Sequence, residues 1–163
     1  ITMLPNNIHH IFTVLWLNKN NRLHQFFSRP STLTATTVYI IVVAAVYNII
    51  LRRLGHPQGL FKLADELLHS VVPFLVLLFW WLYVPKKSLE WRQLWSWLPY
   101  PLAYLIYTFI HGIYTNYYPY PFVDVTALGY QKVFINCLAM TLVFLLFSLL
   151  FIAINRGRKK TKV

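Results

Sequence analysis

Five long apolar runs dominate the 163-residue sequence, and they restrict its possible folds more than any other feature. A helix needs about 20 predominantly apolar residues to cross the hydrocarbon core of a bilayer, where lipid offers no partner to unpaired backbone groups. The runs are too long and too evenly apolar to be strands of a membrane barrel. The sequence therefore predicts an all-α, polytopic integral membrane bundle that forms one domain over residues 1–163. Its five predicted transmembrane helices cover residues 1–17, 33–51, 67–84, 98–114 and 131–154.

The charge of the chain is small in amount but strongly positive in sign. Charged residues make up only 12% of the sequence, about half of what a soluble domain carries, and the formal net charge is +11. A basic chain can bind nucleic acid, but here the Lys and Arg residues lie in short clusters between apolar runs. No basic helix with interleaved aromatic residues is visible in the sequence. We therefore expect no nucleic-acid partner and attribute the charge to membrane topology.

The Lys and Arg residues divide unevenly between the two ends of the predicted bundle. Five helices place alternate loops on opposite sides of the membrane. Eleven of the fifteen basic residues fall on the side of the first loop, the third loop and the C-terminal segment. Basic residues are enriched on the cytoplasmic side of membrane proteins. We therefore expect a multi-pass protein of the cell membrane with a basic cytoplasmic tail, 155–163, and with Trp91, Trp95 and Trp97 at the inner interface.

Polar residues within the predicted helices gather toward the outer end. Asp65 precedes His69 by four residues, so both side chains lie on one face of their helix. Ionisable groups inside a membrane are costly and usually face the interior of a bundle or a water-filled cavity. We therefore expect a polar chamber that opens toward the outer leaflet. Its predicted residues are Thr2, Asn6, Asn48, Asp65, His69 and His111.

The loop NYYPYPFVDV, residues 116–125, joins the fourth and fifth predicted helices at that outer end. Pro119 and Pro121 fix their φ angles and prevent a regular helix. The aromatic rings beside them provide apolar area that packs against helix ends. We expect the loop to form an ordered cap over the chamber, with Tyr118 and Tyr120 at the pocket and Asp124 turned toward a helix terminus or a basic partner.

The polar residues also have structural explanations that need no active site. Asn and Thr side chains commonly hydrogen-bond between membrane helices, and tyrosine stripes commonly pack at interfaces. The chain contains a single cysteine, Cys137, and no HExxH pattern, so we expect neither a metal site nor a cofactor. A small-solute transporter would carry polar residues through the inner half of the bundle and an inverted repeat. The inner half is poor in polar residues, and no inverted repeat is visible in the sequence.

Five segments carry a more specific signal than composition does. They are VYNIILRRLG, DELLHSVVPFLVLLFWWLYVPK, LPYPLAYLIYTFIHG, YYPYPFVDV and GYQKVFIN. In that order they resemble a bacterial branch of the androgen-induced-gene family of integral membrane proteins, and the strongest motifs are LLHxxxP at residues 67–73 and YPYPF at 118–122. The resemblance implies a six-helix bundle with both ends cytoplasmic, so we expect one further helix before Ile1.

The same resemblance implies a chemical activity. Characterised animal members of the family hydrolyse fatty acid esters of hydroxy fatty acids with a threonine nucleophile and an intramembrane histidine. The family histidine matches His69, and the family threonine matches Thr2 in ITMLPNN. The resemblance therefore implies a membrane lipid ester as substrate, with Thr2 as nucleophile, His69 as general base and Asp65 as a residue that orients the imidazole. A non-catalytic lipid-binding or assembly protein is the alternative interpretation, and a transporter is less favoured.

Overall fold

The computed structural model describes residues 22–54 and 58–158, and within these residues it is helical and contains no strand. The prediction of an all-α chain is confirmed for this part of the protein. The elements are α2 (Arg22–Phe27), α3 (Pro30–Ile49), η1 (Leu51–Arg53), α4 (Leu60–Glu66), the π-helical turn η2 (Leu67–Val71), α5 (Val72–Tyr83), η3 (Trp91–Gln93), α6 (Leu94–Trp97), α7 (Pro99–Thr115), η4 (Pro121–Val123) and α8 (Val125–Gly157).

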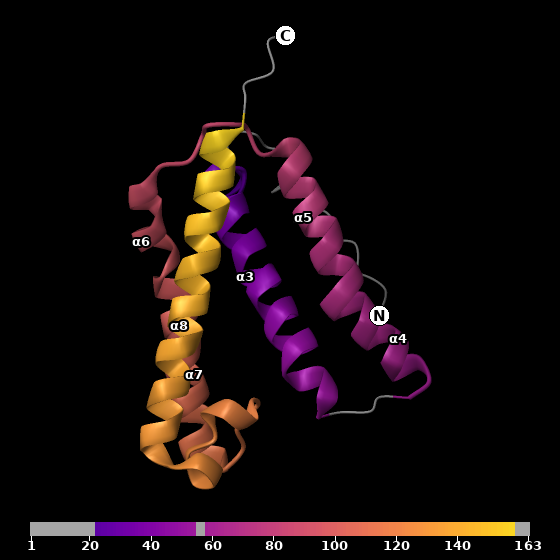
Figure 1. Ribbon diagram of the computed structural model, residues 1–163, viewed down its shortest axis with the longest axis vertical. Coiled ribbons are helices and arrows are strands. Elements are labelled where there is room, and N and C mark those ends of the chain that lie inside the picture. The colour runs from indigo at the N-terminus through magenta and orange to yellow at the C-terminus, as the bar shows by residue number, and fades with distance from the viewer. Residues whose placement is uncertain (1–21, 55–57, 159–163) are drawn as a thin grey trace, which may run out of the picture.

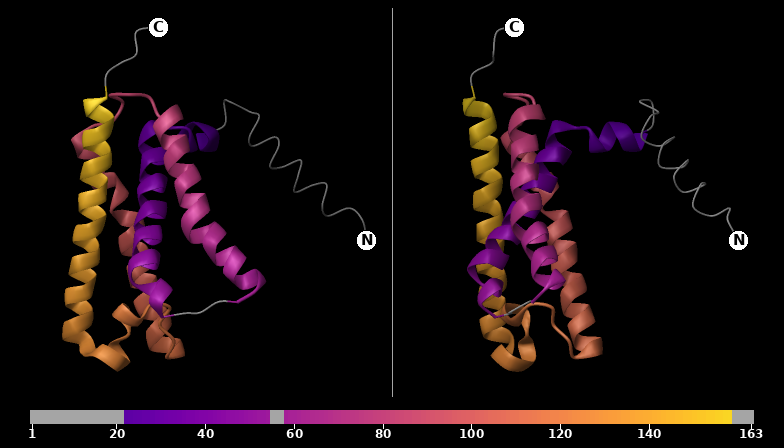
Figure 2. Two further views of the ribbon diagram at one scale, coloured as in Figure 1. Left: turned by 45° about the vertical axis from the view of Figure 1, so that its right-hand side comes forward. Right: turned by 90° about the vertical axis from the view of Figure 1, so that its right-hand side faces the viewer.

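The long helices alternate in direction (Figures 1 and 2). α3 descends in Figure 1, α4 and α5 together ascend, α7 descends and α8 ascends. The loop 84–90 and Arg158 therefore lie at one end of the bundle, which we call the C-terminal end. η1 and the loop 116–124 lie at the opposite end. This alternation of loops is the one that the apolar runs predict, because each run ends in a turn that reverses the chain.

Within the described residues, three helices are long and apolar enough to cross a membrane: Pro30–Arg53, Leu60–Tyr83 and Val125–Gly157. The expectation of five spans is therefore met only in part. The first predicted run, 1–17, lies outside the described residues. The fourth run forms α7, whose 17 residues extend about 25 Å at 1.5 Å per residue, which is less than the hydrocarbon thickness of about 30 Å.

Helix boundaries also differ from the predicted ones, for identifiable reasons. The third predicted span starts at residue 67, whereas the helical rod starts at Leu60, because its first turns carry charged residues that lower hydropathy without breaking the helix. α8 starts at Val125, but its backbone is interrupted at Gly129, where φ is +77° and a side chain would be strained. The continuous part of α8 therefore begins close to the predicted residue 131.

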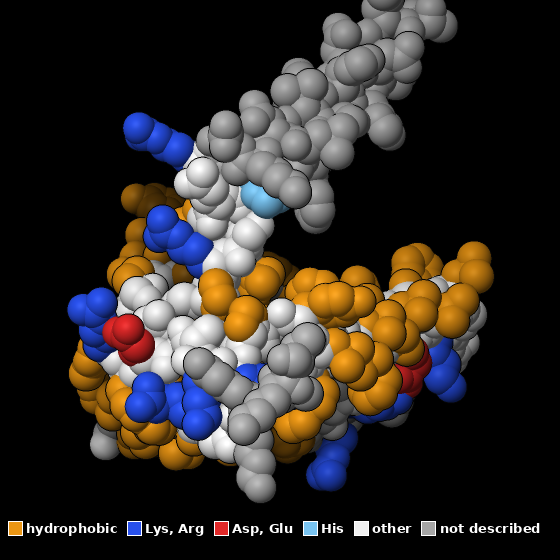
Figure 3. Space-filling model, turned by 90° about the horizontal axis from the view of Figure 1, so that it is seen from above, with side chains coloured by type: hydrophobic (Ala, Val, Ile, Leu, Met, Phe, Trp, Pro, Cys, Tyr) orange, Lys and Arg blue, Asp and Glu red, His pale blue; other side chains and the backbone are white. Residues whose placement is uncertain are grey.

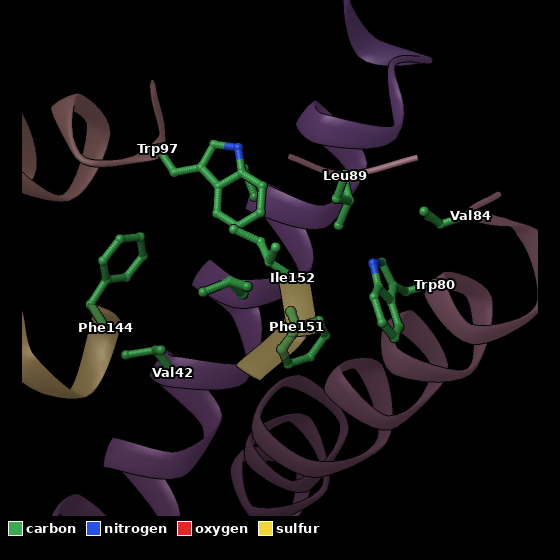
Figure 4. Close-up of a cluster of buried hydrophobic side chains, with 10 residues drawn as sticks. Val42, Trp80, Val84, Leu89, Trp97, Phe144, Phe151 and Ile152 are labelled. Atoms are coloured by element: carbon green, nitrogen blue, oxygen red, sulfur yellow. The ribbon is translucent and has the colours of Figure 1, made fainter. Parts of the chain in front are cut away.

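The apolar core, drawn in Figure 4, lies toward the C-terminal end of the bundle, because its residues come mainly from the first half of α3, the end of α5 and the second half of α8. Side chains from α3, α5, α6 and α8 converge there, and Trp80 and Ile152 are almost completely buried. The indole of Trp80 donates to Thr34 Oγ1 at 2.9 Å, and the indole of Trp97 donates to Ser31 Oγ at 2.9 Å. Trp97 is thus a core residue, because α6 folds it back against α3, and its expected position at the inner interface stays a prediction.

Asn155 ties the C-terminal end together. Its buried side chain accepts hydrogen bonds from the backbone N–H groups of Ser88 (3.0 Å) and Leu89 (3.2 Å) and donates to the carbonyl of Pro85 (2.8 Å). Lys87 N–H donates to the Asn155 carbonyl at 3.0 Å. α8 continues through Gly157, so Asn155 is part of the packed structure, and the cytoplasmic tail stays a prediction.

Candidate functional site

The π-helical turn that contains His69 is the most unusual backbone feature near the opposite end. It spans Leu67–Val71 and is followed by Pro73. Proline has no N–H, so it cannot donate to the carbonyl four residues earlier, which is that of His69. Asn48 Nδ2 on α3 donates to this carbonyl at 2.9 Å. The wide turn, the proline and the asparagine together place His69, and π-bulges of this kind are frequent at functional sites.

The His69 side chain is held by two neighbours. Its Nδ1 lies 3.1 Å from Asp65 Oδ1, as the spacing of four residues predicts, and 3.1 Å from the Asp65 carbonyl oxygen. The ring of Tyr47 stacks on the imidazole with centroids 3.7 Å apart and planes 12° apart. The Tyr47 hydroxyl donates to the other carboxylate oxygen of Asp65. Tyr47, Asp65 and His69 therefore form one connected unit in which the imidazole orientation is fixed.

A second layer of polar groups surrounds this unit. Asn48 Nδ2 also donates to the Ala44 carbonyl at 2.9 Å, and Asn48 Oδ1 accepts from Arg52 at 2.8 Å. Arg52 pairs with Glu66, which accepts a hydrogen bond from Ser70 at 3.1 Å. The amide hydrogens of Asn48 are thus used by two backbone carbonyls. Asn48 orients the backbone of His69, and no hydrogen of its amide is left for a ligand.

His69 and Tyr47 line a cavity of about 240 Å³. Side chains of α3, α7, α8 and the loop before α8 form the rest of its wall, and most of them are aliphatic or aromatic, such as Val46, Leu105 and Phe144. Such a cavity favours a ligand with a long hydrocarbon portion. The arrangement therefore combines a histidine–carboxylate pair with an apolar compartment.

The loop 116–124 contributes to the same cavity, as its two prolines and its aromatic rings predict. Tyr120, Phe122 and Val123 line the cavity, and Val123 is buried. The side chain of Asn136 on α8 holds the loop through a 2.8 Å hydrogen bond to the Phe122 carbonyl. The loop is thus an ordered part of the cavity wall.

Asp124 ends this loop and caps α8. Its Oδ1 accepts from the N–H groups of Thr126 (2.9 Å) and Ala127 (3.1 Å) and from the Thr126 hydroxyl (2.6 Å). These hydrogen bonds, the hydroxyl of Thr126 first among them, hold the pKa of Asp124 below its ordinary value. Asp124 therefore faces a helix terminus, as predicted, and has a structural role at the edge of the site.

Two tyrosine hydroxyls meet in the cavity wall. Tyr104 OH lies 3.2 Å from Tyr120 OH, and both rings line the cavity. Burial, together with the hydrogen bond to Tyr104, raises the pKa of Tyr120 to about 12. Tyr120 therefore keeps its proton at physiological pH and remains a hydrogen-bond donor.

The remaining predicted residues are not brought to this cavity. His111 lies on α7 beside Tyr107 and Tyr117, and Thr115 donates to its carbonyl at 2.7 Å. Tyr118 packs on Gly112 rather than against the cavity. Thr2 and Asn6 lie outside the described residues. Among residues 22–54 and 58–158, no group of three or more His, Cys, Asp or Glu side chains is arranged to hold a metal.

Sequence reasoning missed Tyr47 and Tyr104 as site residues. Tyrosines are abundant in this chain, with 11 in total, so neither one is distinctive by type. The specific role of Asn48, which was predicted only as a chamber residue, does have a sequence signal. A His-x-x-x-Pro spacing implies a histidine carbonyl without a helical donor, and hence a polar partner on a neighbouring helix.

No protein-family model, curated protein or solved structure matches this chain. A functional proposal therefore rests on the geometry around His69 together with the resemblance of the sequence motifs given above.

Proposed function

We propose that this protein is an integral membrane hydrolase of lipid esters, similar to the androgen-induced-gene family, with His69 as general base and Thr2 as nucleophile. The observation that carries the proposal is that His69, paired with Asp65, lies on the wall of an apolar cavity. A hydrocarbon chain fits the cavity, and the imidazole supplies proton transfer near neutral pH.

The chemistry assigns a different role to each ring nitrogen. The Nδ1–H of His69 donates to Asp65, so Nε2 carries the free lone pair, and within the described residues it has no hydrogen-bond partner. Nε2 takes the proton of the Thr2 hydroxyl as the oxygen attacks the ester carbonyl, and it returns that proton to the departing alcohol. Water, activated by the same nitrogen, then releases the acid from Thr2. Asp65 stabilises the imidazolium that forms in each half-reaction.

The proposal includes five spans in this chain and a cytoplasmic C-terminus. Figure 3 shows Lys and Arg side chains spread over the C-terminal end, as expected for a cytoplasmic face. In a Cys137→Ala background, we expect Ser88→Cys to be shielded from an impermeant thiol reagent in intact cells and Asn116→Cys to react. The reverse labelling would place His69 near the inner leaflet and would contradict the orientation.

Hydrolysis itself is tested with the purified full-length protein in lipid nanodiscs and long-chain ester substrates. We expect Thr2→Ala and His69→Ala each to abolish turnover, and the double variant to be no worse, since residues that act as a unit are not additive. Thr2→Ser should retain some activity, and a fluorophosphonate probe should label the wild type but not Thr2→Ala. Thr13→Ala, deeper on the same predicted helix, is the matched control and should be nearly neutral.

A non-catalytic lipid-binding role is the second candidate. It is favoured by one observation, that both amide hydrogens of Asn48 are used by backbone carbonyls, so this side chain has none to donate to a reacting ester. Folded wild-type protein that binds the ester, does not hydrolyse it and takes no probe would select this role over catalysis.

A further inference from the structure

The hydroxyl groups in the cavity wall differ in whether their protons are already used. Thr108 donates to the Tyr104 carbonyl at 2.9 Å, and Thr141 donates to the Cys137 carbonyl at 2.8 Å. The Tyr39 hydroxyl donates to the carbonyl of Trp97 at 2.7 Å. The Tyr47 hydroxyl donates to Asp65. These four groups have no proton left for a ligand. Tyr100 also lines the cavity, and its hydroxyl has no hydrogen-bond partner among the described residues, but the residue is 63% exposed and so lies largely outside the wall.

The Tyr104–Tyr120 pair is different. Two phenols have two protons, and the single 3.2 Å contact between them uses one. The phenol that accepts this hydrogen bond keeps its own proton free. Accepting a hydrogen bond also makes that phenol a stronger donor. Tyr104 is 44% exposed and Tyr120 is partly buried, so the pair lies at the edge of the cavity. A long-chain ligand that covers the pair would desolvate the unused O–H group, which then costs free energy unless the ligand brings an acceptor. The pair is therefore suited to bind an oxygen atom of the ligand.

The charge of that oxygen follows from the rest of the wall. Among the described residues that line the cavity there is no Lys or Arg, and His69 is already paired with Asp65. An ionised carboxylate placed there would lack a cationic partner and would pay a large desolvation cost. A neutral carbonyl or ether oxygen pays far less and needs one donor.

We infer that the Tyr104–Tyr120 hydroxyl pair is a subsite for one neutral acceptor oxygen on a long-chain ligand, and that the cavity rejects ionised fatty acids. The inference rests on the proposed function for the identification of this ligand with the ester substrate. Hydrolysis converts a neutral ester into a carboxylate, so the subsite would bind substrate and favour release of the acid product. A ligand that carries a second, charged end would keep that end outside the cavity.

The test uses binding instead of turnover. A long-chain methyl ketone has the carbonyl but no leaving group, and the alkane of the same length lacks the oxygen. Their affinities are measured in nanodiscs by displacement of a fluorescent long-chain alcohol. Removing one hydroxyl leaves the other free to donate, so Tyr104→Phe and Tyr120→Phe alone should weaken ketone binding by less than about threefold. The double variant should lose about tenfold, with alkane affinity unchanged.

Tyr100→Phe is the matched control, because Tyr100 lies on the same helix and lines the same cavity outside the pair. We expect it to bind the ketone as the wild type does. Unchanged ketone affinity in the double variant, an equal loss for the alkane, or a loss with Tyr100→Phe instead would overturn the inference.

A second comparison addresses the charge. A fatty acid of the same chain length should bind at least tenfold more weakly than the ketone where it is ionised, and should approach the ketone affinity as the pH falls and it becomes neutral. Equal binding of the ionised acid would overturn the inference. Neither result depends on turnover. Preference for the ketone over the alkane and the ionised acid, without ester hydrolysis, would remove the proposed function and keep the subsite. Ester hydrolysis without that preference would keep the proposed function and remove the subsite.

Discussion

Asn48 on α3 donates a 2.9 Å hydrogen bond to the main-chain carbonyl of His69 in the neighbouring helical rod. The bond exists because Pro73 cannot supply the N–H that an α-helix would offer to that carbonyl. A side chain on one helix thus completes the backbone hydrogen bonding of another, at the residue that we propose as the base.

This relationship predicts a specific coupling between Asn48 and Pro73. Asn48→Ala should lower the free energy of unfolding by about 1–3 kcal/mol, because it leaves a carbonyl unsatisfied. In a Pro73→Ala background the restored N–H can serve the His69 carbonyl, so the same substitution should cost about 1 kcal/mol less. Denaturant unfolding in detergent measures both values. An identical cost in the two backgrounds would contradict the role given to Pro73.

Asp65 should matter to turnover more than to stability. Asp65→Asn keeps the shape of the side chain but presents an amide to Nδ1 of His69, and we expect kcat to fall by about 100-fold or more with a small change in KM. Glu66→Gln is the matched control, since Glu66 faces Arg52 and Ser70 instead of the imidazole. Equal losses in the two variants would point to a general effect of charge at this end of the bundle.

Asn155 should be among the most sensitive positions for stability. Asn155→Ala removes its three side-chain hydrogen bonds and leaves buried backbone groups of the 85–89 segment unpaired, so we expect a loss of about 2–4 kcal/mol. Ser88→Ala keeps the N–H that Asn155 accepts and loses only an exposed hydroxyl bond, so its unfolding midpoint should stay near that of the wild type. A neutral Asn155→Ala would show that the loop is held by other contacts.

The cap at Asp124 should depend on pH. Its pKa is lowered in the folded protein from the ordinary value of 3.8, so its stabilising contribution is present above that value and is lost as pH falls through the lower folded pKa. At pH 7, Asp124→Ala should lower the thermal midpoint by about 2–4 °C. The difference from wild type should shrink in strong acid. Asp124→Asn, which caps without a titrating group, should be close to wild type at pH 7 and should not show this acid dependence.

The close contact between Gly112 and Tyr118 predicts a conditional effect. A Cβ at position 112 would lie 2.1 Å from Tyr118 Cε1, so Gly112→Ala forces the ring to move and should destabilise the protein by about 1–3 kcal/mol. With Tyr118→Ala the obstruction is gone, and the better helix propensity of alanine should make the same change neutral or stabilising. Calorimetry of the four proteins in the cycle measures the coupling, and additive effects would exclude the clash.

Local features of this protein could be predicted from the sequence alone. The apolar runs predict helices because membrane-length segments must satisfy their own backbone groups, and the three longest described helices follow them. The approach of Asp65 to His69 follows from a spacing of one helical turn, and the capping role of Asp124 follows from its place between a proline-rich loop and a helix. Each of these depends on residues within a few positions of one another.

The tertiary structure alone decided which distant side chains share a site. Tyr47 stacks on His69 across 22 positions, Asn155 holds a loop about 70 positions earlier in the chain, and Trp97 enters the core because α6 folds toward α3. The cavity that joins His69 to Tyr104 and Tyr120 likewise depends on how α3, α7 and α8 are rotated relative to one another. Periodicity indicates that a helix has an apolar face but contains no information on which partner that face meets, because many packings bury similar area. The contacts that define the site therefore required the packed helices.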